Sequence, residues 1–256
     1  VRFDDRVTGK VEKFCERGTI VHIDIDASEL NKNRKANLPV VGDIKDALKR
    51  LNAMVVAHPI NKKHTAWLAQ IAEWKQKGPF QYAITPEIAN SDHMKDHLKG
   101  KESEVILQEM VVEMLYELTG GDAYITTGVG QHQMWAGQWY KYKFPRQFIT
   151  SAGLGSMGYG YPAALGVKVA HPDRPVLAIC GDGGFMFTMP ELATAVQHGI
   201  NSVAIVFNDS GFGNVRRTQK MQFDGRYHGS DLTNPDFLAL AKSFGMLGLR
   251  ASSPTE

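Results

Sequence analysis

The sequence has few cysteines, little net charge and no long apolar run. Only Cys15 and Cys180 occur among 256 residues, far apart in the sequence, so neither a disulfide framework nor a cysteine metal site is indicated. A net charge of +2, from 29 basic and 27 acidic side chains, provides no long-range field to hold nucleic acid or an anionic membrane. Any phosphate group must therefore be bound by local groups.

No apolar run reaches the roughly 18 residues that a membrane-spanning helix requires, and residues 1–6 lack the features of a signal peptide. We expect a protein of a reducing compartment: the cytoplasm, or a plastid or mitochondrion if the source is eukaryotic. The chain does not begin with Met, which indicates a fragment. Its hydrophobic content of 43% is sufficient for one large or two modest domains.

Strand and helix patterns alternate at the start of the chain. An apolar run at residues 19–25 predicts a strand, and Val40-Val41-Gly42-Asp43 leads into a helical pattern at residues 44–54. We interpret residues 1–57 as the last part of a Rossmann-like α/β domain.

A linker and a second α/β domain follow. Residues 58–102 have weak periodicity and several prolines, and predict a linker with one helix at residues 65–75. An amphipathic helix at residues 103–119 opens a parallel-sheet domain over residues 103–256. Its predicted strands are residues 123–127, 147–151, 176–180 and 202–208, with helices at residues 161–170 and 189–198.

Two of these strands end in turns that carry acidic residues. Residues 176–180 run into Gly181-Asp182-Gly183-Gly184, and residues 202–207 run into Asn208-Asp209-Ser210-Gly211. The helix between them has a possible capping box, Thr188 and Glu191. A right-handed crossover makes the two strands parallel, so Asp182 and Asp209, 27 positions apart, should lie together at the ligand-binding edge of the sheet.

Two carboxylates at such an edge suit a magnesium ion that takes further oxygens from a carbonyl, waters and phosphates. The glycine loop after Asp182 would supply N–H groups to those phosphates. Each turn by itself is common and would be structural. Their spacing after two apolar strands favours an anchor for magnesium and a diphosphate.

A second motif competes with this interpretation. Gly153-Leu154-Gly155-Ser156-Met157-Gly158 has the Gly-x-Gly-x-x-Gly pattern of a dinucleotide-binding fold, with Asp182 at the end of the next strand. The glycine run continues to Gly160, however, and Asp182 lies in its own glycine loop, which fits an anion site better than a ribose contact.

The motifs together resemble the thiamine-diphosphate enzymes, and among these the large catalytic subunit of the acetolactate (acetohydroxyacid) synthase family. Residues 3–10 (FDDRVTGK) and 21–26 (VHIDID) resemble the end of its central FAD-binding domain, and residues 127–135 (TGVGQHQMW) resemble the opening of its diphosphate-binding domain. Residues 153–158 then resemble the loop near the pyrimidine ring of the cofactor. The resemblance covers nearly the whole chain.

The resemblance implies two cofactor sites. Asp182, Asp209 and the carbonyl of Gly211 would bind magnesium, and Met157 would bend thiamine diphosphate into a V shape, although a core methionine would look the same in sequence. The other expected thiamine diphosphate contacts are Val129, Gly130, Gln131, His132, Met134, Gly155, Gly183, Gly184, Gly213 and Val215. The expected FAD contacts are Arg2, Asp4, Arg6, Asp24, Ile25, Gly42 and Asp43, of which those after residue 21 could equally be solvated acids at a strand end.

The implied reaction is a transfer that joins pyruvate to a second 2-keto acid and forms acetohydroxyacids for branched-chain amino acid biosynthesis. The implied assembly is a homodimer or homotetramer with sites between chains. A regulatory subunit is a possible further partner. The glutamate that activates the cofactor belongs to the N-terminal domain of a partner chain. That domain is missing here, so we expect the fragment by itself to be inactive.

The sequence departs from the family pattern at two places. Asp209 stands where the family usually has Asn, and residues 214–219 (NVRRTQ) replace the expected Met-Val and the later Gln-Trp. A decarboxylase or a benzaldehyde-lyase-like enzyme therefore stays open as an alternative, as does a non-catalytic cofactor-binding fragment. Arg216 and Arg217 could be solvated or could face an anionic 2-keto acid. We expect packing roles for Trp67, Trp74, Trp135 and Trp139.

Overall fold

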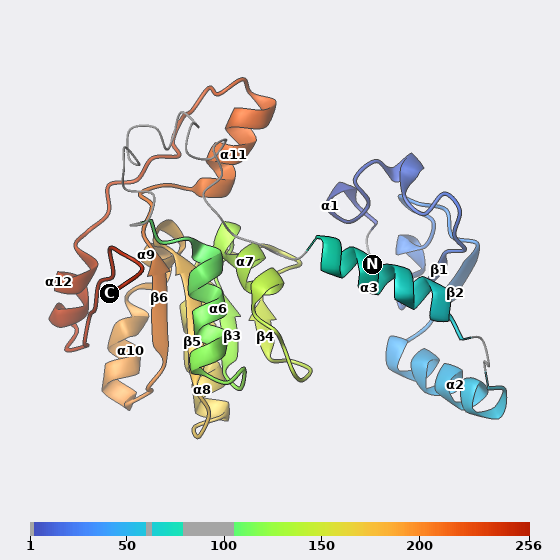
Figure 1. The fold of residues 1–256 in the computed structure, drawn as a ribbon, viewed down its shortest axis with the longest axis horizontal. Helices are drawn as coiled ribbons and strands as arrows, with labels where there is room; N and C mark the ends of the chain where they lie inside the picture. The colour runs from blue at the N-terminus through green and yellow to red at the C-terminus, as the bar shows by residue number, and fades with distance from the viewer. Residues whose placement is uncertain (1–2, 60–62, 79–104) are drawn as a thin grey trace. The chain divides into compact units, whose positions relative to one another are not determined.

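A computed structural model describes residues 3–59, 63–78 and 105–256. The chain divides into two compact units, Val1–Pro79 and Phe80–Glu256, and the division falls inside the predicted linker (Figure 1). In the described residues, no helix combines the length and the apolar character needed to cross a membrane.

The first unit is built on a pair of parallel strands. The strands β1 (Val21–Asp24) and β2 (Leu38–Val41) pair in parallel, with Asp24 opposite Val41. The other elements are α1 (Asp5–Thr8), two 3-10 turns at Val11–Lys13 and Ala27–Glu29, α2 (Ile44–Ala57) and α3 (Thr65–Lys77). The strand and the two helices predicted for this part are confirmed, and the strand pairing gives the expected α/β character.

The second unit contains a four-stranded sheet in the order β4-β3-β5-β6, with all pairs parallel. All four predicted strands are confirmed to within one or two residues. The elements in chain order are α6 (Gln108–Leu118), β3 (Tyr124–Thr127), α7 (Gln131–Trp139), β4 (Phe148–Thr150), α8 (Gly160–Ala170), β5 (Val176–Gly181), α9 (Asp182–Thr188), α10 (Glu191–His198), β6 (Val203–Phe207), α11 (Gly213–Gln222) and α12 (Phe237–Ser243).

Three local predictions are wrong. The helix predicted at residues 103–119 begins at Gln108, and residues 105–107 are not helical. The glycines after Asp182 do not form an open loop, because α9 begins at Asp182 itself. There is no capping box at the next helix: α10 begins after Pro190, which caps it without a side-chain bond. The hydroxyl of Thr188 donates instead to the carbonyl of Gly158 at 2.9 Å, so this threonine joins α9 to the loop before α8.

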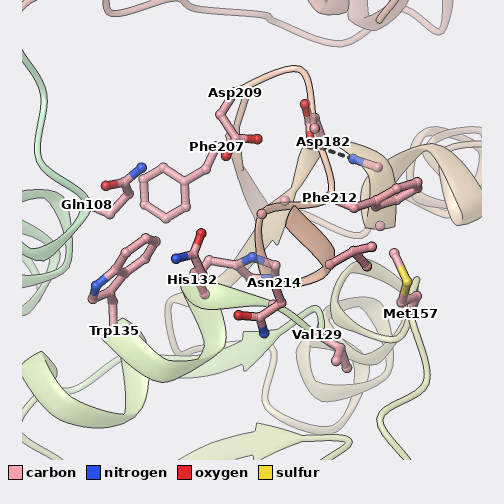
Figure 2. Close-up of a pocket in the computed structure, with 18 of the residues that line it drawn as sticks. Gln108, Val129, His132, Trp135, Met157, Asp182, Phe207, Asp209, Phe212 and Asn214 are labelled. Carbon is pink, nitrogen blue, oxygen red and sulfur yellow. Dashed lines mark hydrogen bonds between the residues drawn. The ribbon is translucent and has the colours of Figure 1, made fainter. Parts of the chain in front are cut away.

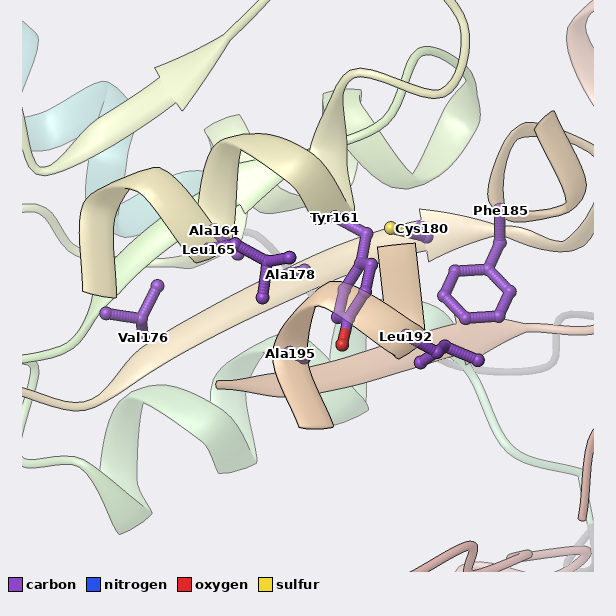
Figure 3. Close-up of a cluster of buried hydrophobic side chains, with 9 residues drawn as sticks. All are labelled: Tyr161, Ala164, Leu165, Val176, Ala178, Cys180, Phe185, Leu192 and Ala195. Carbon is purple, nitrogen blue, oxygen red and sulfur yellow. The ribbon is translucent and has the colours of Figure 1, made fainter. Parts of the chain in front are cut away.

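Helices cover both faces of the sheet, which makes a three-layer structure (Figure 1). Alternate residues of β5 point to opposite faces. Ala178 and Cys180 pack with α8, α9 and α10 in the cluster of Figure 3, whereas Leu177 and Ile179 pack with α6 and α7. Burial on both faces explains why the strand has no polar residue in its sequence.

The strand order creates a switch point between β3 and β5. The chain passes from β3 to β4 on one side, then returns across β3 to form β5 on the other side. Helix α7 packs on one face of the sheet, and α8 packs on the opposite face. In parallel α/β sheets, ligands bind at the carboxyl ends of the strands at such a point.

Helix α8 approaches the sheet closely at Gly160. The hydroxyl of Thr126 in β3 donates to the Gly160 carbonyl at 2.7 Å. A Cβ atom on Gly160 would lie 2.5 Å from the backbone nitrogen of Gly128 and 3.0 Å from the sulfur of Cys180. Only glycine therefore allows this contact, which fixes the height of α8 above the switch point.

We predict that Gly160→Ala lowers the free energy of unfolding by about 1–3 kcal/mol, because the backbone must move to admit the methyl group. Gly166→Ala is the matched control in the same helix, since a Cβ there meets nothing within 4 Å. It should raise stability by roughly 0.5–1 kcal/mol, because alanine loses less backbone entropy in a helix. Urea unfolding of both variants measures the difference, and equal effects would contradict this account.

Candidate functional site

A pocket lies at the switch point, at the carboxyl ends of β3, β5 and β6 (Figure 2). Three turns supply most of its walls: the one before α7, the one after β5 and the one after β6. Its lining residues are Gln108, Val129, Gly130, Gln131, His132, Trp135, Gly155, Met157, Gly181, Asp182, Gly183, Gly184, Phe207, Asp209, Gly211, Phe212, Gly213, Asn214 and Val215.

The structure brings together most of the residues that sequence reasoning assigned to magnesium and thiamine diphosphate. All of them line the pocket except Met134, which lies on α7 with 41% of its surface exposed. The assignment of Met134 is therefore not supported by the pocket geometry.

Asp182 is the most firmly held polar group of the pocket, with only 1% of its surface exposed. Its Oδ1 accepts a hydrogen bond from the backbone N–H of Gly183 at 2.7 Å (Figure 2). Its Oδ2 accepts from the side-chain amide of Asn234 at 2.6 Å. Both oxygens thus have fixed directions, and each keeps a lone pair for a further partner.

Asp209 lies on the neighbouring turn, as the sequence predicted. The register pairs Gly181 with Phe207, so Asp182 and Asn208 follow at the same level of the sheet. Asp209 comes next and is exposed, in contrast to the buried Asp182. Its Oδ2 would lie 3.6 Å from a Cβ on Gly213, and that Cβ would also meet the side chain of Gln131. Glycine at 213 therefore keeps this corner of the pocket open.

These groups do not form a complete protein metal site. In the described part of the chain, no three His, Cys, Asp or Glu side chains are grouped so that they could hold a metal ion. Two carboxylates and a carbonyl match the predicted arrangement, in which a phosphate-bearing ligand completes the magnesium shell.

His132 has a buried imidazole ring that lies between the carboxyl ends of the central strands β3 and β5. Cβ atoms on Gly128, Gly130 and Gly181 would each come within about 3 Å of its ring, so three glycines make room for it. Burial lowers the pKa of His132 to about 4, and the nearby Gly128 backbone has a smaller opposing effect. The ring is neutral near pH 7, and its Nε2 is buried without a hydrogen-bond partner among the described residues.

Apolar side chains form the other walls. Met157 and Val129 lie together with Phe212, whereas Phe207, Trp135 and Gln108 lie on the opposite side of the pocket (Figure 2). Met157 is 37% exposed, so the alternative of a core methionine is not supported.

Several residues at the site were not predicted from the sequence. Gln108 precedes the second domain's other motifs by about twenty positions, and nothing in its surroundings signals a pocket. Phe207 and Phe212 flank the turn of Asp209, so their proximity to that turn could have revealed them. Asn234, which bonds to Asp182 across 52 positions, has no local signal at all.

The two arginines after the pocket have different surroundings. Arg216 forms an ion pair with Asp231, and its guanidinium lies 4.5 Å from the centre of the Tyr227 ring. Arg217 is exposed. Neither arginine lines the pocket, so its geometry favours the structural and solvated alternatives over a contact to a 2-keto acid.

The tryptophans have mainly packing contacts, as expected. Trp67 and Trp74 pack edge to face, with ring centres 5.3 Å apart. Trp135 and Trp139 pack against the cluster formed by α6, α7 and β3. Trp135 also reaches the pocket, which the sequence did not indicate.

Four of the residues expected to contact FAD, Asp24, Ile25, Gly42 and Asp43, lie in the first unit where the carboxyl ends of β1 and β2 meet. Asp24 ends β1 and is followed by Ile25, which is 72% exposed, while Gly42 and Asp43 follow β2. Asp43 caps α2 by accepting from the N–H groups of Lys45 and Asp46. Asp4 is partly buried; Arg2 and the side chain of Arg6 lie outside what the structure describes.

A hydrogen bond from the backbone N–H of Asp26 lowers the pKa of Asp24. The bond from Asp26 to Asp24 spans 3.0 Å, so it stabilises the turn after β1. Both alternatives for this edge, a ligand site and a strand end with solvated acids, remain compatible with its exposure.

The dinucleotide interpretation of residues 153–158 does not fit the topology. A Rossmann fingerprint requires the acidic residue at the end of the strand next to the glycine loop's strand. Here the loop follows β4 and Asp182 follows β5, and β3 lies between these two strands. The loop instead contributes Gly155 and Met157 to the pocket.

Comparisons with known proteins give a consistent family. Residues 128–256 match the family model described as thiamine pyrophosphate enzyme, C-terminal TPP binding domain. Residues 1–51 match the model described as thiamine pyrophosphate enzyme, central domain.

Curated relatives match along all or nearly all of the chain. The acetolactate synthase large subunit of Haemophilus influenzae is 37% identical over 259 residues, which cover 100% of this chain and 42% of the relative. The isozyme 3 large subunit of Escherichia coli is 37% identical over 260 residues, with the same coverage. The acetolactate synthase of Mycobacterium bovis is 40% identical over 257 residues, which cover 97% of this chain and 39% of the relative. The chain thus spans about two fifths of the length of these relatives.

The buried His132 predicts a pH dependence of stability. Its folded pKa of about 4 lies below its unfolded value of about 6.5, so the unfolded state binds more protons between these values. Its stabilising contribution is complete above about pH 6.5 and is lost as the pH falls toward 4. We expect a loss of roughly 3 kcal/mol at most from this residue.

Urea unfolding at pH 7.5, 5.5 and 4.5 measures this loss. His132→Asn should show a smaller decrease in stability than the wild-type protein over this range. His198→Asn is the control, because His198 is exposed at the end of α10 and should keep the wild-type dependence. Identical pH profiles for wild type and His132→Asn would show that the imidazole is not held neutral by burial.

Proposed function

The chain belongs to the thiamine pyrophosphate enzyme family, and from this premise we propose that it is the cofactor-binding part of an acetolactate-synthase-type transferase. Such an enzyme joins pyruvate to a second 2-keto acid and forms acetohydroxyacids for branched-chain amino acid biosynthesis. The observation that carries the proposal is the pocket at the switch point, where Asp182 and Asp209 lie on adjacent turns. The matching relatives are named acetolactate synthases.

We assign the pocket to thiamine diphosphate with magnesium. Asp182, Asp209 and the carbonyl of Gly211 would hold the metal ion. The diphosphate would lie against Gln131, His132, Gly183 and Gly184. The pocket fits this ligand in two respects: the buried Nε2 of His132 has no partner among the described residues, and Gly213 leaves the corner beside Asp209 open.

Bound thiamine diphosphate supplies a nucleophilic carbon and an electron sink, which the decarboxylation of a 2-keto acid requires. This chain's residues contribute binding and orientation. The neutral His132 offers a hydrogen bond without adding a charge, while the two carboxylates supply the negative charge that a divalent cation requires. Met157 and Val129 form an apolar wall that limits the conformations available to a bound ring system.

We further propose FAD as a second cofactor, bound at the edge formed by the ends of β1 and β2. The exposed Ile25 offers an apolar contact there, and a ligand can approach the backbone of Gly42, where a Cβ would meet nothing within 4 Å. The match of residues 1–51 to the central domain of the family supports a role in the same enzyme.

The proposed assembly is a homodimer or homotetramer in which a partner chain supplies the activating glutamate, with a possible regulatory subunit. We propose the cytoplasm as its location, or a plastid or mitochondrion in a eukaryote. A 2-keto-acid decarboxylase or benzaldehyde-lyase-like activity is the second candidate, favoured by residues 214–219, of which Asn214 lines the pocket where the family pattern has Met.

The first test is cofactor binding. Asp182→Ala should weaken binding of thiamine diphosphate in the presence of magnesium by more than about 100-fold, because loss of an outer-shell partner alone typically costs 10–100-fold in metal affinity. Asp173→Ala is the matched control, since Asp173 is an exposed residue in the turn before β5 and should bind as wild type does. Calorimetry measures the affinity of both variants. Equal affinities for Asp182→Ala and wild type would contradict the assignment of Asp182 as a magnesium ligand.

The second test is product analysis. The full-length protein, supplied with pyruvate, thiamine diphosphate, magnesium and FAD, should form acetolactate. Formation of acetaldehyde without acetolactate would replace the proposed reaction with the decarboxylase alternative. A protein that binds the cofactor but forms neither product would support a non-catalytic binding role.

A further inference from the structure

We propose that Asn234 is a positioning residue of the metal site: its side-chain amide fixes the Asp182 carboxylate and ties it to the turn that carries Asp209. The inference rests on the magnesium site of the proposed function. It concerns a residue that lies outside the pocket lining and outside every motif in the sequence.

The Nδ2 group of Asn234 donates two hydrogen bonds. One goes to Oδ2 of Asp182 at 2.6 Å, and the other goes to Oδ1 of Asn208 at 2.7 Å. An ionised carboxylate accepts hydrogen bonds and donates none, so the NH2 side of the amide must face Asp182. One amide group therefore joins the end of β5 to the end of β6.

The second bond to Asp182 comes from the backbone of Gly183, which donates to Oδ1 at 2.7 Å. With one donor on each oxygen, rotation of the carboxylate about its Cβ–Cγ bond is blocked. Each oxygen still keeps a lone pair for a metal ion. Without Asn234, only the Gly183 bond would restrain the carboxylate.

The backbone of residues 230–232 places Asn234 beside the site. This segment pairs antiparallel with the turn after β6 through the Gly211–Asp231 bridge. The N–H of Phe212 donates to the carbonyl of Ser230 at 2.9 Å, and the N–H of Leu232 donates to the carbonyl of Ser210 at 2.9 Å. Because the pairing includes the turn that carries Asp209, Asn234 is held in a fixed relation to both expected ligands.

Close packing secures the same segment to the start of α9. A Cβ on Gly183 would lie 2.3 Å from the ring of Phe212 and 2.9 Å from the side chain of Leu232. Arg216 of α11 pairs with Asp231 and adds a link on the other side. These contacts limit the movement of Asn234 relative to Asp182.

The chemistry of Asn234 points to a role for its donors. Its Oδ1 is buried and has no hydrogen-bond partner among the described residues, which is a cost that an apolar side chain of similar size would avoid. The nearby Asp236 has a local role, since it caps α12 through the N–H groups of Leu238 and Ala239. Both bonds of Asn234 instead reach distant residues: Asp182, an expected ligand 52 positions away, and Asn208, which precedes Asp209 and lies 26 positions away.

Fixed ligand directions matter more for magnesium than for calcium. Magnesium requires near-ideal octahedral geometry at short distances, whereas calcium accepts flexible coordination at longer distances. Loss of the Asn234 donors should therefore reduce magnesium affinity more than calcium affinity. A general loss of stability would not produce such a difference.

Magnesium or calcium is titrated into the full-length protein at saturating thiamine diphosphate, and calorimetry measures the affinity for each ion. Asn234→Ala should weaken magnesium binding by about 10–100-fold, the usual effect of removing an outer-shell partner, with a smaller loss for calcium. Asn234→Leu should behave in the same way, because it keeps the volume and removes the donors. Asn201→Ala is the control, since Asn201 is exposed before the start of β6.

Asn208→Ala provides a second route if the Asn234 variants do not fold. It removes one acceptor from the bridge and should give a smaller magnesium loss of the same selective kind. Wild-type magnesium affinity in the folded Asn234 variants, or equal losses for magnesium and calcium, would overturn the positioning role. Failure of the proposed function looks different: the wild-type protein itself would then show no metal-dependent binding of thiamine diphosphate.

Discussion

The parallel pairing of β3, β5 and β6 is the constraint on which the candidate site depends. All three strands present their carboxyl ends at one edge, so the turns before α7, after β5 and after β6 converge there. The β5–β6 register runs from Leu177 opposite Val203 to Gly181 opposite Phe207, which brings the two acidic turns to the same level. If β6 ran antiparallel, Asp209 would lie at the opposite edge of the sheet. Burial of β5 on both faces stabilises the arrangement.

Close contacts and hydrogen bonds fix the orientation of the side chains at the strand ends. Gly160 allows α8 to approach β3, and three glycines make room for the His132 ring. Asp182 is buried and hydrogen-bonded at both oxygens, whereas Asp209 is exposed on its turn. A cation would thus meet one preorganised carboxylate and a second that solvent can reach.

The sequence predicted the parts of this arrangement that depend on local patterns. Apolar runs identified β5 and β6, and the crossover rule placed Asp182 and Asp209 together. The glycines at residues 181–184 predicted a loop after β5, but α9 begins there, and Phe185 of that helix packs into the core. Met134 was assigned from a motif, and it does not line the pocket. The role of Asn234 could not be predicted, because its partners are distant in sequence and only the antiparallel pairing of residues 230–232 brings it to them.

We propose that Asp182 and Asp209 share one divalent cation with a diphosphate. A crystal structure of the protein with thiamine diphosphate and manganese, using the anomalous signal of the metal, tests this most directly. We predict a single anomalous peak within about 2.0–2.6 Å of oxygen atoms from both carboxylates and the diphosphate, the range of hard-cation coordination distances. A bound cofactor whose metal ion contacts neither Asp182 nor Asp209 would contradict the account.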